Sequence, residues 1–173
     1  MDAGESLTRT TVWLALALYV AGELVQSLRW NRTARVLNTA GCLAFITHVG
    51  CAFHFYHHWS HASAYAETAR QTAEYFGVNW GGGLYFNYAF LVLWIVHAIR
   101  SWTKPAGSRP PVRWILWFTR GFILMMIFNG AVVFARGPIR WFGLLLCGGL
   151  VASWGLQARR RIMAAPSLPV VDR

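Results

Sequence analysis

The sequence predicts an all-α integral membrane protein: a bundle of five transmembrane helices with a short extracytoplasmic interfacial helix between the second and third. Three observations lead to this fold class. Of the 173 residues, 56% are hydrophobic and 13% are charged, whereas an ordinary soluble domain has about 25% charged residues. Aromatic residues make up 16%. The apolar residues form five continuous runs without alternation, which favours helices over β-strands.

The five apolar runs have the length that a membrane-spanning helix needs, which is about 20 residues for a hydrocarbon layer of ~30 Å. Prolines lie between the runs, where helices end. The runs cover residues 11–28, 36–58, 82–102, 112–134 and 139–156. We therefore expect one transmembrane helical domain, residues 1–163, followed by a disordered cytoplasmic tail, residues 164–173.

Residues 59–80 are too polar to cross the membrane but have the composition of a helix. They contain Ala, Glu, Arg and Gln, which favour helix. Gly77 is placed as a glycine that ends a helix. The glycines at 81–83 permit a tight re-entry into the membrane or a close approach of the backbone to a ligand; alternatively, they form a flexible hinge between two helices. We predict a short helix at the outer membrane interface.

The net charge of +10 does not point to nucleic-acid binding, because the basic residues lie between apolar runs. In such positions they indicate the orientation of the chain in the membrane. Basic residues concentrate in three connections, which we assign to the cytoplasmic side: Arg29, Arg32, Arg35; Arg100, Lys104, Arg109, Arg113; Arg159, Arg160, Arg161. This gives a protein of the cytoplasmic (inner) membrane of a bacterium with its N-terminus out and its C-terminus in. The expected partners are the lipid bilayer and other membrane subunits or further copies of the chain.

The histidines carry the most specific chemistry, because five of the six lie between positions 48 and 61. If the second helix continued to His61, four imidazoles would share a sector of roughly 100° at its outer end. Spacings of three and four residues let imidazoles converge on one ion. We predict a transition-metal centre (Fe, Cu or Zn) at the outer membrane boundary, in a redox subunit that transfers electrons or activates oxygen. Its predicted ligands are His54, His57, His58 and His61.

Further ligands or supporting groups for this centre are His48, Glu23, His97, Glu67 and Glu74. Glu67 and Glu74 project away from the histidines if the helix is straight, so they need a bend near Ser60 or Ser63. Glu23 is expected at the depth of His48, where its carboxylate would orient that imidazole; Arg120 is an alternative partner for the carboxylate.

Residues 54–58, His-Phe-Tyr-His-His, have the form H-x-x-H-H. This pattern resembles one histidine box of the membrane fatty-acid desaturase and hydroxylase superfamily, in which three such boxes hold a di-iron centre. The resemblance covers five residues, and the other boxes are missing from the sequence. It implies a shared ligand chemistry and not membership of the superfamily.

Two other functions remain open. His48 and His97 lie on different apolar runs and would form the axial pair of a b-type haem. Alternatively, the protein is a non-catalytic scaffold or assembly subunit of a larger membrane complex. In that case the histidines are ordinary interfacial residues with a wet polar end. The sequence shows no phosphate loop and no Ser/His/Asp triad.

Overall fold

The computed structural model describes residues 3–28, 31–103, 113–135 and 137–163. The predicted tail, residues 164–173, and the basic residues Arg29, Lys104 and Arg109 lie outside these ranges. In the described ranges the chain forms six α-helices and a π-helical turn, and no strand. The elements are α1 (Ala3–Ser27), α2 (Asn31–Phe55), α3 (His61–Phe76), α4 (Gly83–Thr103), α5 (Arg113–Phe128), η1 (Asn129–Val133) and α6 (Ile139–Met163).

Four helical segments of the described chain are long and apolar enough to cross a membrane: Asn31–Phe55, Gly83–Thr103, Trp114–Val133 and Ile139–Arg160. Large apolar side chains are exposed on them, with Leu145 at 72% and Leu43 at 59% exposure. Such surfaces suit a lipid bilayer. The α1 helix is outside this set, so the fifth span and the orientation of the bundle stay predictions.

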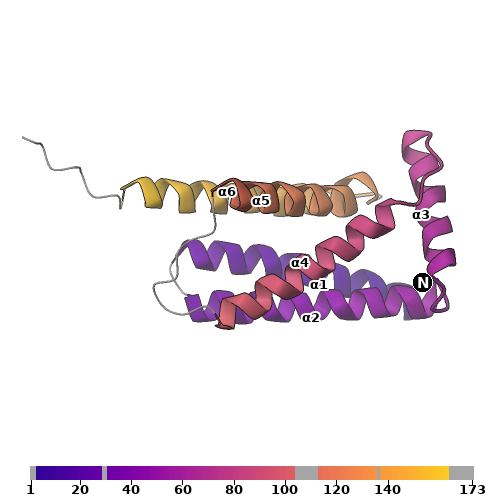
Figure 1. The fold of residues 1–173 in the computed structure, drawn as a ribbon, viewed down its shortest axis with the longest axis horizontal. Helices are drawn as coiled ribbons and strands as arrows, with labels where there is room; N and C mark the ends of the chain where they lie inside the picture. The colour runs from indigo at the N-terminus through magenta and orange to yellow at the C-terminus, as the bar shows by residue number, and fades with distance from the viewer. Residues whose placement is uncertain (1–2, 29–30, 104–112, 136, 164–173) are drawn as a thin grey trace, which may run out of the picture.

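The α1 and α2 helices form an antiparallel pair in which small residues bring the two backbones close (Figure 1). A Cβ atom on Gly22 would lie 3.3 Å from the Ala34 carbonyl oxygen, and one on Gly41 would lie 3.1 Å from that of Ala15. The α4 helix crosses this pair obliquely. The α5 and α6 helices lie together along another side of the α1–α2 pair, where α6 contacts α1 (Figure 1). The aromatic rings of Tyr19, Phe45, Phe90 and Trp94 fill the junction of α1, α2 and α4, with neighbouring centroids 5.1–5.5 Å apart.

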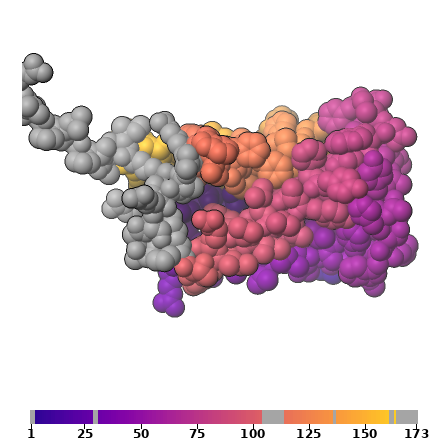
Figure 2. All heavy atoms as spheres, viewed as in Figure 1, coloured from indigo at the N-terminus to yellow at the C-terminus, as the bar shows by residue number. Residues whose placement is uncertain are grey.

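The α3 helix lies across one end of the bundle, which we call the α3 end (Figures 1 and 2). The helix begins at an N-cap, where the Ser60 hydroxyl accepts a hydrogen bond from the Ser63 amide at 3.2 Å. It ends at Gly77, whose φ of 72° is the left-handed conformation of a C-cap glycine. The helix predicted from the sequence is confirmed, together with Gly77 as its end, whereas its position at a membrane interface stays a prediction.

Two glycines allow close contacts between backbones, one at the α3 end and one between η1 and α6. A Cβ atom on Gly81 would lie 2.4 Å from the Tyr65 carbonyl oxygen, so the chain leaving α3 passes directly over that helix. Similarly, a Cβ atom on Gly143 of α6 would lie 2.1 Å from the carbonyl oxygen of Ala131 in η1. Only glycine fits at either position.

Candidate functional site

The α2 helix ends at Phe55, so the condition for a shared histidine face, a second helix that continues to His61, is not met. His58 and Trp59 adopt positive φ values of 47° and 60°, a left-handed conformation that cannot continue a right-handed helix. The Ser60 amide then donates to the His57 carbonyl at 2.8 Å. The chain therefore turns away from the direction of α2 within five residues and enters α3 across the end of the bundle (Figure 1). The shared face on which the four histidines were predicted to lie is not formed.

The four predicted ligands are distributed around this turn. His54 is exposed in the last turn of α2, His57 is half-buried in the turn itself, and His58 is exposed beside it. His61 begins α3, with its Nδ1 3.1 Å from the Tyr88 hydroxyl. Within the described ranges, no group of three or more His, Cys, Asp and Glu side chains is placed to hold a metal ion. The four-histidine metal centre thus stays a prediction.

The α3 end contains a cavity of about 700 Å³, the inner cavity, which is lined by residues of all six α-helices and of η1. Apolar side chains from several helices form its deeper wall: Leu16, Phe45, Phe90, Leu91, Met126 and Ile127. Polar side chains also line it: His48, His57, Glu67, Gln71, Asn87 and Tyr88. The cavity therefore has an apolar body and polar groups from α2, α3 and α4.

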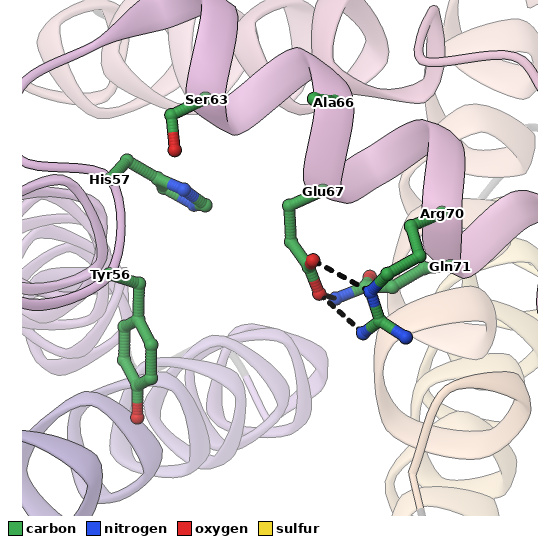
Figure 3. A pocket seen from close by; sticks show the side chains of 7 residues that line it. All are labelled: Tyr56, His57, Ser63, Ala66, Glu67, Arg70 and Gln71. Atoms are coloured by element: carbon green, nitrogen blue, oxygen red, sulfur yellow. Dashed lines mark hydrogen bonds and ion pairs between the residues drawn. The ribbon is translucent and has the colours of Figure 1, made fainter.

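A second hollow of about 710 Å³, the end pocket, lies between α3 and the turn before it. It is lined by Tyr56, His57, Ser63, Ala66, Glu67, Arg70 and Gln71 (Figure 3). His57, Glu67 and Gln71 line both the end pocket and the inner cavity. These three side chains therefore form the boundary between the two spaces.

His57 and Glu67 extend into the end pocket from opposite sides, one from the turn and one from α3 (Figure 3). The His57 Nδ1 atom is buried and has no hydrogen-bond partner in the described chain. Burial lowers the pKa of His57 below its ordinary value, and the nearby Glu67 carboxylate opposes this only in part. The imidazole is therefore neutral at pH 7, with one ring nitrogen a donor and the other an acceptor.

The Glu67 carboxylate is already paired. Arg70 donates to it through Nη2 at 2.7 Å and Nε at 2.8 Å, and Gln71 donates at 2.9 Å. The hydrogen bonds from Arg70 lower the pKa of Glu67. The bend at Ser60 is what brings Glu67 to face His57, whereas Glu74 pairs with Arg70 at 3.2 Å on the exposed part of α3. The Glu67 side chain is therefore a hydrogen-bond acceptor in the site, with its charge balanced by Arg70.

His48 lines the inner cavity from α2. Its Nδ1 lies 2.9 Å from the carbonyl oxygen of Thr8 on α1. A carbonyl only accepts, so this contact assigns the proton to Nδ1 and leaves Nε2 as an acceptor. A second imidazole nitrogen in the cavity lining is therefore available to a ligand.

Glu23 is not level with His48, and this expectation is wrong. Its carboxylate accepts hydrogen bonds from Trp154 Nε1 at 2.9 Å and Gln157 Nε2 at 3.3 Å. Thr8, the partner of His48, precedes Glu23 by fifteen residues on α1, about 22 Å along a helix. The difference arises because α1 begins at Ala3 and α2 ends at Phe55, which moves Glu23 deeper and His48 nearer the α3 end. Arg120 reaches this network through the Gln157 side chain.

His97 lies on an exposed part of α4, so the predicted haem pair consists of one cavity histidine and one surface histidine. Sequence reasoning did not assign Gln71 or Tyr88 to the site. The spacing of Glu67, Arg70 and Gln71 at three and four residues was a usable signal, since such side chains meet on one helix. Tyr88 has no such signal, because its place depends on how α4 crosses α2.

Comparisons with protein-family models, curated proteins and solved structures found no significant match.

Proposed function

We propose that the protein is a membrane subunit that binds a small amphiphilic molecule in the inner cavity, with the polar head of the molecule against His57. One observation carries this proposal: an apolar-walled cavity is lined by the His57 imidazole, whose Nδ1 has no partner in the described chain. A buried polar atom without a partner is costly, so a ligand that draws this ring into a hydrogen bond gains affinity. The volume of about 700 Å³ is that of an ordinary small-molecule site.

The test fills the cavity from one helix and compares it with a matched change elsewhere on that helix. Ala52→Phe places a ring in the inner cavity, which Ala52 lines. Ala40→Phe is the control, because Ala40 is exposed on the same helix and outside that lining. Bromine-labelled decanol is the ligand, because bromine quenches tryptophan emission and Trp13 lines the cavity.

Saturable quenching of the wild-type chain and of Ala40→Phe, with at least about tenfold weaker binding to Ala52→Phe, supports the proposal; tenfold corresponds to about 1.4 kcal/mol. Equal quenching curves for the two variants contradict it, because the label would then report partition into lipid or detergent.

The histidine-ligated metal centre is the second candidate, favoured by the placement of the His57 imidazole and the Glu67 carboxylate on one pocket. Nitrogen and oxygen donors of this kind suit Fe, Cu and Zn. His54, His58 and His61, or a second copy of the chain, would supply the further ligands. Elemental analysis of purified protein should then show stoichiometric metal, lost in a His57→Ala/Glu67→Gln double variant and retained in Arg9→Ala. Protein without metal after growth with each ion removes this candidate.

A b-type haem on His48 is favoured by one observation, the hydrogen bond from its Nδ1 to the Thr8 carbonyl. This arrangement fixes the tautomer that a metal-binding imidazole uses, because Nε2 keeps its lone pair. An absorption spectrum of the same purified sample tests this candidate. A Soret band that disappears in His48→Ala is the expected result, and a spectrum without the band excludes it.

A further inference from the structure

We infer that the inner cavity takes an uncharged molecule with a flat carbonyl- or hydroxyl-bearing ring and an apolar tail, the chemistry of a quinone or quinol. This inference rests on the proposed function and adds the chemical class of the ligand. Three features of the lining carry it: its balanced charge, its imidazole nitrogens and its aromatic surfaces.

Each charged side chain in the lining of the inner cavity has an ion-pair partner, which lies in the same lining or, for Glu67, in the adjoining end pocket. Glu67 is held by Arg70 and Gln71. Glu5, on the α1 wall, pairs with Arg9 at 3.3 Å. A carboxylate or ammonium head would bring a net charge into a site that already balances its own, and a charge without a counter-ion is costly to bury. The charge balance therefore favours an uncharged head.

The hydrogen-bonding groups suit a head that both accepts and donates. The partnerless Nδ1 of His57 belongs to a neutral imidazole, which can place its proton on either nitrogen. It can donate to a ring carbonyl, or accept from a ring hydroxyl after a change of tautomer. His48 offers a fixed acceptor in the same cavity. A head group that interconverts between carbonyl and hydroxyl forms matches this pair.

Flat aromatic faces lie beside His57. The Phe53 ring packs edge-on against the His57 ring, with centroids 5.6 Å apart. Phe53 and Tyr88 lie within 27° of parallel, with centroids 6.5 Å apart, and both line the cavity. These two rings face each other, and the Tyr88 ring also lies within 29° of parallel to the His61 ring, with centroids 5.9 Å apart. A flat head group would therefore join an existing aromatic cluster, which it can meet edge-on.

The cavity offers an apolar wall to the tail of the ligand and an opening through which the tail can leave. Leu91, Met126 and Ile127 form apolar lining. Gly130 of η1 also lines the cavity, is exposed, and has no atom within 4 Å of the position that a Cβ would take. This gap gives a tail longer than the cavity a route to the lipid.

The test measures binding of four molecules with the same ten-carbon tail to the full-length chain in lipid nanodiscs: a decyl-substituted benzoquinone, decanol, decanoate and decyltrimethylammonium. Each competes with bromine-labelled decanol for quenching of tryptophan. We expect the benzoquinone to bind at least tenfold more tightly than the other three. Equal or tighter binding of decanol or of either charged molecule overturns the inference and leaves the proposed function intact. No saturable binding of any of the four overturns both.

Variants then locate the head group. His57→Phe should weaken benzoquinone binding about tenfold, His57→Gln should restore part of it through its amide, and His54→Phe should change it less than twofold. His54 is the control because it lies outside the lining of both spaces. Thermal midpoints of the variants identify any that fail to fold. Unchanged affinity in a folded His57→Phe protein overturns the assignment, as does a folded His57→Gln protein that binds no more tightly than His57→Phe.

Discussion

At the end of the bundle away from α3, the buried Glu23 carboxylate accepts hydrogen bonds from Trp154 and Gln157, whereas at the α3 end the buried His57 Nδ1 has no partner in the described chain. Glu23 lies among apolar helices, where an unsatisfied polar group costs several kcal/mol in lipid, and His57 lies in the turn that follows α2. The Glu23 end satisfies its polar groups with its own side chains. The α3 end keeps open space beside them.

The Glu23 network is closed on several sides. The Arg120 guanidinium lies 5.1 Å from the Trp154 ring centroid and donates to Gln157. Glu23 is 5% exposed, which leaves little of it for a ligand to reach. A buried acidic residue is the more conspicuous signal in a membrane sequence. Here, however, the buried Glu23 belongs to a network that joins helices to each other. The end at which we propose binding has a less complete network.

The largest expected effect breaks the closed network. Glu23→Ala removes the acceptor of Trp154 and Gln157 and should lower the free energy of unfolding by about 2–4 kcal/mol. Denaturant titration in detergent measures it. Glu74→Ala is the control, because Glu74 belongs to an exposed pair on α3, and such pairs contribute at most about 1 kcal/mol. Equal losses in the two variants would remove the distinction between the ends.

A smaller effect is expected from one donor of the same network. Trp154→Phe keeps the ring but removes the indole N–H that donates to Glu23, and should cost about 1–2 kcal/mol. Combined with Glu23→Ala, it should add little, because both changes remove one interaction. A double-mutant cycle measures this coupling, and fully additive losses would show that the two side chains act independently.

His57→Phe sharpens the comparison from the other end. No hydrogen bond to Nδ1 is lost, and a buried polar atom without a partner is replaced by carbon. The free energy of unfolding should therefore change by less than about 1 kcal/mol and can rise. The same denaturant titration measures it. A loss as large as that of Glu23→Ala would mean that His57 holds the fold.

The smallest effect is a pH dependence. The pKa of His57 in the folded protein lies below the ordinary imidazole value because the ring is buried. Between that lowered pKa and the ordinary value of about 6.5, the unfolded chain binds more protons, so stability rises with pH. The contribution of the neutral His57 ring to stability is fully present above about pH 6.5 and decreases as the pH falls. NMR titration of the histidine ring protons should show the low pKa, and Glu67→Gln should lower it further by removing a favourable charge. An upward shift in that variant would contradict the assignment.

Composition and periodicity predicted the helices well, because long apolar runs and a C-cap glycine are local signals. The end of α2 was missed, since His58 and Trp59 take left-handed conformations that neither residue favours. The N-cap at Ser60 was the available local signal, and it is where the bend that Glu67 needed occurs. The inner cavity depends on the crossing of α4 over α1 and α2, which arises from packing between distant segments and has no local pattern in the sequence.

The contact at Gly81 sets how closely α3 can settle onto the membrane helices. Because a Cβ there would meet the Tyr65 carbonyl oxygen at 2.4 Å, an alanine at this position has to push the helix outward. Glu67 and Gln71 would move with it while His57, attached to the other side of the turn, stays behind. The distance between His57 on one side of the boundary and Glu67 and Gln71 on the other therefore depends on the absence of a methyl group at Gly81.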